Sequence, residues 1–135
     1  MFVDDIRERA RDARMLWDAD RREGAFLLAL VSVAVRAKLE HPEMKGDRAR
    51  FEEFIRTRLG PRVSVEFRGR LEPLERVFYK WMRCELVHGA GLPVDVQFVE
   101  PDDPRELSVR AGGAPTSVLL VSTGWFEQLL DWAVT

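Results

Sequence analysis

With 135 residues, 46% of them hydrophobic, the chain is long enough to form one hydrophobic core without disulfides or structural metals. A net charge of −2 gives no overall positive field for nucleic acid. A lone cysteine (Cys84), a charged N-terminal segment, and apolar runs shorter than the roughly 20 residues of a membrane helix together predict a cytoplasmic protein with no membrane contact.

The first half of the sequence predicts three helices. Asp4 and Asp5 can cap the first, because apolar residues follow them at helical spacing. Segment 25–40 is apolar nearly all round, which is typical of the central helix of a bundle. The third helix is predicted over 47–59 and ends at Gly60.

A fourth helix is predicted between Pro73 and Gly89, which fit its first turn and its end. One side of this helix is apolar and is expected to face the core; it comprises Leu71, Leu74, Val77, Phe78, Trp81, Met82 and Leu86. The other side is basic with one aromatic residue and comprises Arg76, Tyr79, Lys80 and Arg83. Before the helix, residues 62–68 alternate in polarity, which fits a short strand or an extended loop.

After the fourth helix the apolar period changes to two, which predicts short strands around 94–98, 107–110 and 117–122, with a breaker at 111–115. Ser122 or Thr123 is expected to cap a last helix over 125–134. The apolar residues of that helix cover more than one face, so either the core surrounds it or a second subunit covers the rest.

Near the end of the fourth helix, four residues separate Arg83 from His88. This Arg-x4-His spacing, within the segment YKWMRCELVHGAGLP, resembles the motif of the HEPN superfamily over about residues 20–100. The resemblance implies a mainly α fold: a HEPN-like four-helix bundle with, in this chain, a small C-terminal antiparallel β element and a final short helix. We expect one domain over 1–135, with the bundle at about 4–90 and the β element and last helix at about 93–135.

Many HEPN domains are metal-independent endoribonucleases, often toxins that act as homodimers, so the resemblance implies RNA and an antitoxin-like protein as partners and no cofactor or metal. Arg83 would stabilise the charge of the scissile phosphate, and His88 would transfer a proton as the RNA 2′-hydroxyl attacks. The residues expected to bind RNA are Arg76, Tyr79 and Lys80, and those expected to support the site are Glu85 and Cys84.

Other interpretations of the same residues stay open. Active HEPN motifs usually carry a polar residue where this chain has Cys84, and on an ideal helix Arg83 and His88 lie roughly 140° apart. His88 fits a helix C-terminus that favours cations, Glu85 fits a structural partner of His88 or of Arg36, and the basic side fits a solvated surface.

The sequence holds a second Arg-x4-His, from Arg36 to His41, so the spacing alone is not specific. Three functions are therefore compatible with the chain: an RNA-cleaving or RNA-binding domain, a non-catalytic HEPN-like module that binds a protein or nucleotide, and a structural or regulatory oligomer.

Overall fold

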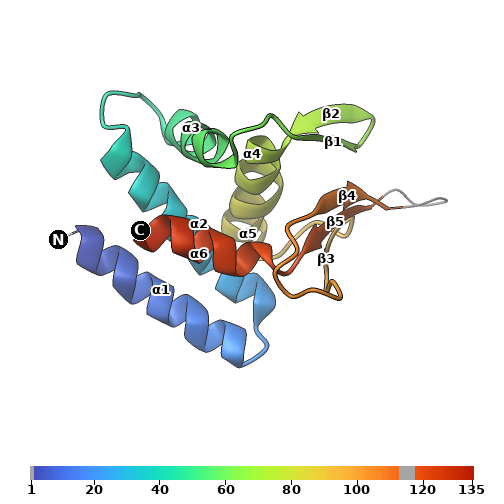
Figure 1. Cartoon of the computed structure of the whole chain (residues 1–135), viewed down its shortest axis with the longest axis horizontal. Coiled ribbons are helices and arrows are strands. Elements are labelled where there is room, and N and C mark those ends of the chain that lie inside the picture. The colour runs from blue at the N-terminus through green and yellow to red at the C-terminus, as the bar shows by residue number, and fades with distance from the viewer. Residues whose placement is uncertain (1, 113–117) are drawn as a thin grey trace.

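The computed structural model describes residues 2–112 and 118–135 and is mainly helical (Figure 1). Helices α1 (Phe2–Asp18) and α2 (Arg22–Glu40) run antiparallel and lie against each other. Because α1 begins at Phe2, Asp4 and Asp5 lie in its first turn and do not cap it. Their charges still favour the positive end of the helix dipole.

Helix α2 is the centre of the molecule, as its sequence predicts. It contacts α1, α3 (Asp47–Leu59), the helix that follows α3, and α6 (Trp125–Val134). Its buried residues are Ala25, Phe26, Ala29, Leu30, Ser32, Val33, Ala34 and Ala37. The one polar side chain among them, Ser32, donates a hydrogen bond of 2.8 Å to the carbonyl oxygen of Leu28, so that its burial leaves no donor unpaired.

The predicted fourth helix forms and has three parts. A short α-helical segment, α4 (Leu74–Arg76), leads into a π-helix, η1 (Val77–Cys84), and then into α5 (Glu85–Gly89). We call residues 74–89 the composite helix. Its buried apolar side confirms most of the predicted stripe, namely Leu74, Val77, Phe78, Met82 and Leu86.

The prediction that Leu71 faces the core is wrong, because its side chain is 74% exposed. It belongs to β2 (Arg70–Pro73), which pairs antiparallel with β1 (Ser64–Phe67). The two strands are joined by Arg68 and Gly69, both with positive φ, as the favoured two-residue hairpin turns require. The strand interpretation of residues 62–68 is therefore correct, and its partner strand is an addition to the prediction.

The C-terminal strands form a mixed sheet in the order β3-β5-β4. Strand β5 (Leu119–Ser122) lies in the middle, antiparallel to β4 (Val109–Ala111) and parallel to β3 (Val96–Val99). The prediction of an antiparallel element is thus correct for β4 and β5 and wrong for β3 and β5, which are parallel. The reason is that β5 lies between the two strands that precede it in the sequence. The predicted breaker at 111–115 is wrong at Ala111, which ends β4, and its residues 113–115 lie outside the described residues, as does residue 117 at the start of the predicted third strand.

Helix α6 packs against α1 and α2. Trp125, Phe126, Leu129, Leu130 and Ala133 are all buried, so the core of the same chain covers this helix. Neither predicted cap is used: Gly124 stands at the N-cap position, and the Ser122 hydroxyl donates to the carbonyl oxygen of Glu106 at 2.7 Å.

The mainly α class of the prediction is confirmed, with two small sheets beside the helices. Over residues 2–112 and 118–135, no helix combines the length and the apolar character that crossing a bilayer requires.

Candidate functional site

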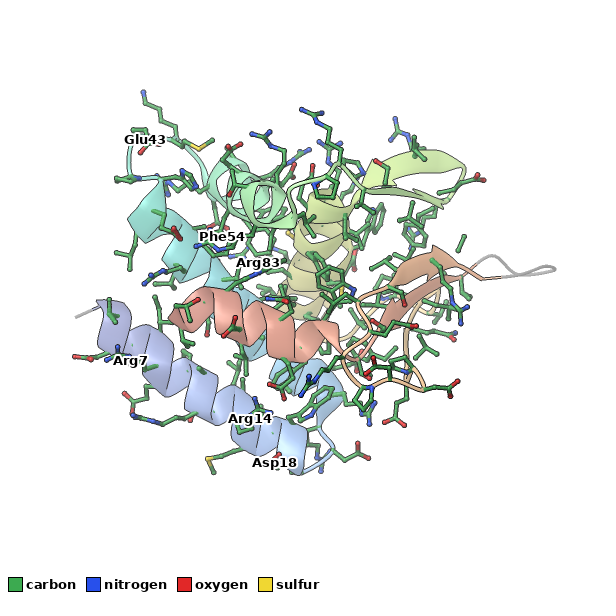
Figure 2. The ribbon with its side chains drawn as sticks, viewed as in Figure 1. Arg7, Arg14, Asp18, Glu43, Phe54 and Arg83 are labelled. Carbon is green, nitrogen blue, oxygen red and sulfur yellow. The ribbon has the colours of Figure 1, made fainter. Side chains whose placement is uncertain are left out.

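Arg83, the first residue of the Arg-x4-His motif, is held by a carboxylate from another helix. Its guanidinium lies 2.9 Å from Asp47 Oδ2, at the first residue of α3. The Arg83 side chain is only 22% exposed, and the same guanidinium lies 5.3 Å from the centre of the Tyr79 ring. Figure 2 labels Arg83 on the composite helix, close to α3. A carboxylate and an aromatic ring therefore fix the orientation of this arginine before any ligand is present.

Asp47 was absent from the predicted site, because an aspartate at the start of a helix usually serves the helix dipole. Here it serves two partners, since the Tyr79 hydroxyl also lies 3.5 Å from Asp47 Oδ2, at the long limit of a hydrogen bond. The Arg83 Nε–H is buried and makes no hydrogen bond to any described residue. The guanidinium thus keeps its Nε–H as a donor that Asp47 does not use.

The π-helical winding of η1 changes which residues share a side of the helix. Hydrogen bonds five residues apart bring Tyr79 and Cys84 onto one side, where Cys84 contributes to the raised pKa of the tyrosine hydroxyl. Partial burial raises the pKa of Tyr79 above its usual 10.0; the charges of Cys84 and Asp47 raise it further, and that of Arg83 lowers it. Tyr79, Arg83, Cys84 and Asp47 form one cluster, which we call the Arg83 cluster.

The basic side of the composite helix faces α3 and is only in part a free surface. Arg76 lies 3.7 Å from Glu52, and the Tyr79 ring packs on Phe51 with 5.4 Å between ring centroids. Lys80 is the exposed exception, with its ammonium group 4.7 Å from the centre of the Trp81 ring. Two of the three residues expected to bind RNA are thereby engaged by α3.

His88, the second motif residue, is exposed near the end of α5 and makes no hydrogen bond or ion pair with the described residues. Arg83 and Cys84 are the last two residues of the π-helix η1, and the α-helix α5 follows directly from Glu85, with φ −65° and ψ −40° at Cys84. The composite helix therefore does not unwind before His88. On an ideal α-helix, at about 100° per residue, side chains five residues apart would point roughly 140° apart. A single chain therefore presents Arg83 and His88 on different sides of one helix.

Glu85, at the first residue of α5, interacts with Arg68 of the β1–β2 turn through charge alone. It acts on Arg68, whose pKa is raised mainly by the hydrogen bond to Asp95 and, to a smaller extent, by the charges of Asp95 and Glu85. Arg68 itself binds Asp95 with two contacts of 2.8 Å and stacks 4.4 Å above the Trp81 ring. Glu85 thus neighbours Arg68, and neither His88 nor Arg36 is its partner.

In the second Arg-x4-His of the sequence, the arginine, Arg36, contacts the C-terminal end of the chain and its own helix. Arg36 donates to the carbonyl oxygen of Thr135 at 2.9 Å, and its Nε lies 3.7 Å from Glu40. His41 lies 3.7 Å from Glu43 in the loop after α2. This copy ties the end of α6 to α2, whereas the Arg83 copy lies beside half-exposed polar groups.

Within residues 2–112 and 118–135, no group of three or more His, Cys, Asp or Glu side chains is placed to hold a metal ion. The Arg83 cluster offers a positioned guanidinium, a hydroxyl, a thiol and a carboxylate.

Comparison with protein families, with curated proteins and with solved structures finds no match for this chain.

Proposed function

We propose that this protein is a HEPN-like, metal-independent endoribonuclease that acts as a homodimer. The observation that carries the proposal is the state of the two motif residues: Arg83 is held in place by Asp47 and Tyr79, while His88 stands exposed without a partner among the described residues. A positioned cation suits a phosphate that gains charge in the transition state, and a solvated imidazole near neutral pH suits proton transfer.

The different directions of Arg83 and His88 are the reason for proposing a dimer. One phosphate cannot contact both side chains of a single straight helix when they lie roughly 140° apart. In a pair of copies related by a two-fold axis, His88 of one chain can complete the site that Arg83 forms in the other. Lys80 supplies an exposed positive charge beside that site.

A second candidate function is a non-catalytic HEPN-like module that binds a protein or a nucleotide. Arg83 and Arg76, two cations of the expected RNA surface, are paired with Asp47 and Glu52, which reduces the positive charge available to a polyanion. Cys84 at the position after the motif arginine also fits this alternative.

Cleavage of labelled RNA in excess chelator separates the two candidates. The purified protein is compared with Arg83→Ala, with His88→Ala, and with His41→Ala as a matched control, because His41 ends the other Arg-x4-His. We expect each change in the Arg83 copy to reduce the cleavage rate at least about 100-fold, as general acid–base and electrostatic contributions usually do. The control is expected to retain the parental rate.

The dimer adds a further test, because a site shared between two chains loses specific activity on dilution below its dissociation constant. Mixing Arg83→Ala with His88→Ala protein should restore part of the activity, since a mixed dimer holds one intact site. No cleavage by the parent, together with retention of RNA or of a protein partner, would favour the binding module.

A further inference from the structure

A cavity of about 260 Å³ opens where the last turns of α2 meet the start of α3. Its lining residues are Val35, Lys38, Leu39, Pro42 and Arg50. Val35, Lys38 and Leu39 share one side of α2, being three and four residues apart, and Pro42 closes the cavity from the loop. Glu43, labelled in Figure 2, marks this corner of the molecule, away from Arg83.

The walls of this cavity are apolar and its two polar lining residues are cations. Val35 and Leu39 are half-buried and pack on the core, whereas Lys38 is exposed and pairs with no described residue. Arg50 donates from Nε to the carbonyl oxygen of Met44 at 2.9 Å. This single hydrogen bond orients its guanidinium and leaves both terminal nitrogens without a partner among the described residues.

The carboxylates nearest in sequence have other partners. Glu40 accepts two hydrogen bonds from Arg58, of 2.7 and 2.9 Å, and Glu43 lies 3.7 Å from His41. None of the five lining residues is acidic, unlike the cavity beside α6, which Glu127 and Asp131 line. The charge of this cavity therefore favours an anion, and its walls favour an apolar body.

We propose that this cavity binds an organic monocarboxylate with an apolar body, its carboxylate between Lys38 and Arg50. A volume of about 260 Å³ equals roughly nine times the 30 Å³ that one water molecule takes in the liquid, which suits a ligand of about nine or ten non-hydrogen atoms. Straight-chain octanoate has this size. Its chain would lie along Val35, Leu39 and Pro42. The site is independent of the proposed ribonuclease.

The test is a titration of the full chain with octanoate, followed by backbone amide chemical shifts. We expect saturable shifts confined to about residues 35–50. Octan-1-ol keeps the apolar chain but lacks the carboxylate, and acetate keeps the carboxylate but lacks the chain. Both should therefore bind at least about tenfold more weakly than octanoate. Lys38→Gln with Arg50→Gln should weaken octanoate binding by about 10-fold to 100-fold, the usual worth of charge-assisted hydrogen bonds.

Lys45→Gln is the matched control, because Lys45 is an exposed lysine of the neighbouring loop that does not line the cavity. Val35→Phe tests the cavity without changing its charge and should block octanoate while Lys38 and Arg50 remain. Equal binding of octanoate and octan-1-ol, unchanged affinity in the double variant, or the absence of saturable shifts in residues 35–50 would each overturn the proposal.

Discussion

Tyr79 is the one tyrosine of the sequence, so it reports directly on the Arg83 cluster. Its ring contacts the Arg83 guanidinium and Phe51, and its hydroxyl lies beside Asp47 and Cys84. Burial raises the pKa of this hydroxyl, and the two acidic neighbours add to the effect against the opposing charge of Arg83. Because the folded state favours neutral Tyr79, its contribution to stability is complete below the usual pKa and is lost as pH rises through the raised one.

The alkaline titration of tyrosinate absorbance is expected to give a midpoint above the usual value of 10.0. Asp47→Asn should lower this midpoint, because it removes one negative neighbour, and Arg83→Ala should raise it, because it removes the positive one. Glu66→Gln, in the exposed part of β1, is the control and should leave the midpoint unchanged. A parental midpoint at or below 10, or equal midpoints in the Asp47 and Arg83 variants, would contradict the geometry of the cluster.

At the level of elements, the spacing of hydrophobic residues and the residues that start or stop helices predicted most of the helices. The third helix has the predicted bounds, since Asp47 starts it and Gly60 ends it, and the buried side of the composite helix follows from the spacing of Val77, Phe78 and Met82. These features depend on residues close together in the sequence, so a local pattern is sufficient to predict them.

Features set by distant residues were not predictable in this way. The basic side of the composite helix looks like a solvated surface until α3 places Asp47 and Glu52 opposite Arg83 and Arg76. No residue pattern in the sequence predicts that η1 is a π-helix. This π-helical winding brings Tyr79 and Cys84 onto one side of the helix. The central place of β5 likewise depends on a register between segments more than 20 residues apart.

The β1–β2 hairpin is joined to the start of β3 by the Arg68–Asp95 ion pair. The hydrogen bond from Arg68 is the main reason that the pKa of Asp95 is lowered below its usual 3.8. A lowered folded-state pKa contributes stability that is present above the usual pKa and is lost as pH falls through the lowered one.

Asp95→Asn keeps the shape of the side chain and removes this charge. At pH 7 we expect the variant to be less stable by about 0.5–1 kcal/mol, because Arg68 is half exposed and exposed ion pairs have modest worth. The difference should shrink as pH falls below about 4, where Asp95 of the parent gains its proton. Urea unfolding at a series of pH values measures it, and a difference that persists unchanged at pH 2 would assign the stabilisation to something other than the ion pair.

At the scale of the whole molecule, Phe126 joins the two ends of the chain. It is fully buried, stacks on Trp17 of α1 with 4.3 Å between ring centroids, and lies 5.8 Å from Phe26 of α2. Beside it, the Arg14 guanidinium lies 5.3 Å from the centre of the same ring and donates a hydrogen bond of 2.6 Å to the Glu127 carboxylate. The last helix is therefore a structural part of the core formed by the first two.

Phe126→Ala should destabilise the protein by about 3–5 kcal/mol, because it removes a buried ring and leaves a cavity among aromatic neighbours. That loss is a large fraction of the roughly 5–15 kcal/mol that stabilises an ordinary domain. Val134→Ala, in the same helix with its side chain 36% exposed, is the control and should change stability by about 0.5 kcal/mol or less. Urea unfolding measures both, at several protein concentrations. The proposed homodimer can itself raise both midpoints with concentration, so the readout is the difference between the variant and the parent. Because the chain's own core covers α6, the cost of Phe126→Ala should be the same at every concentration, whereas a second subunit that covered α6 would make this cost depend on concentration.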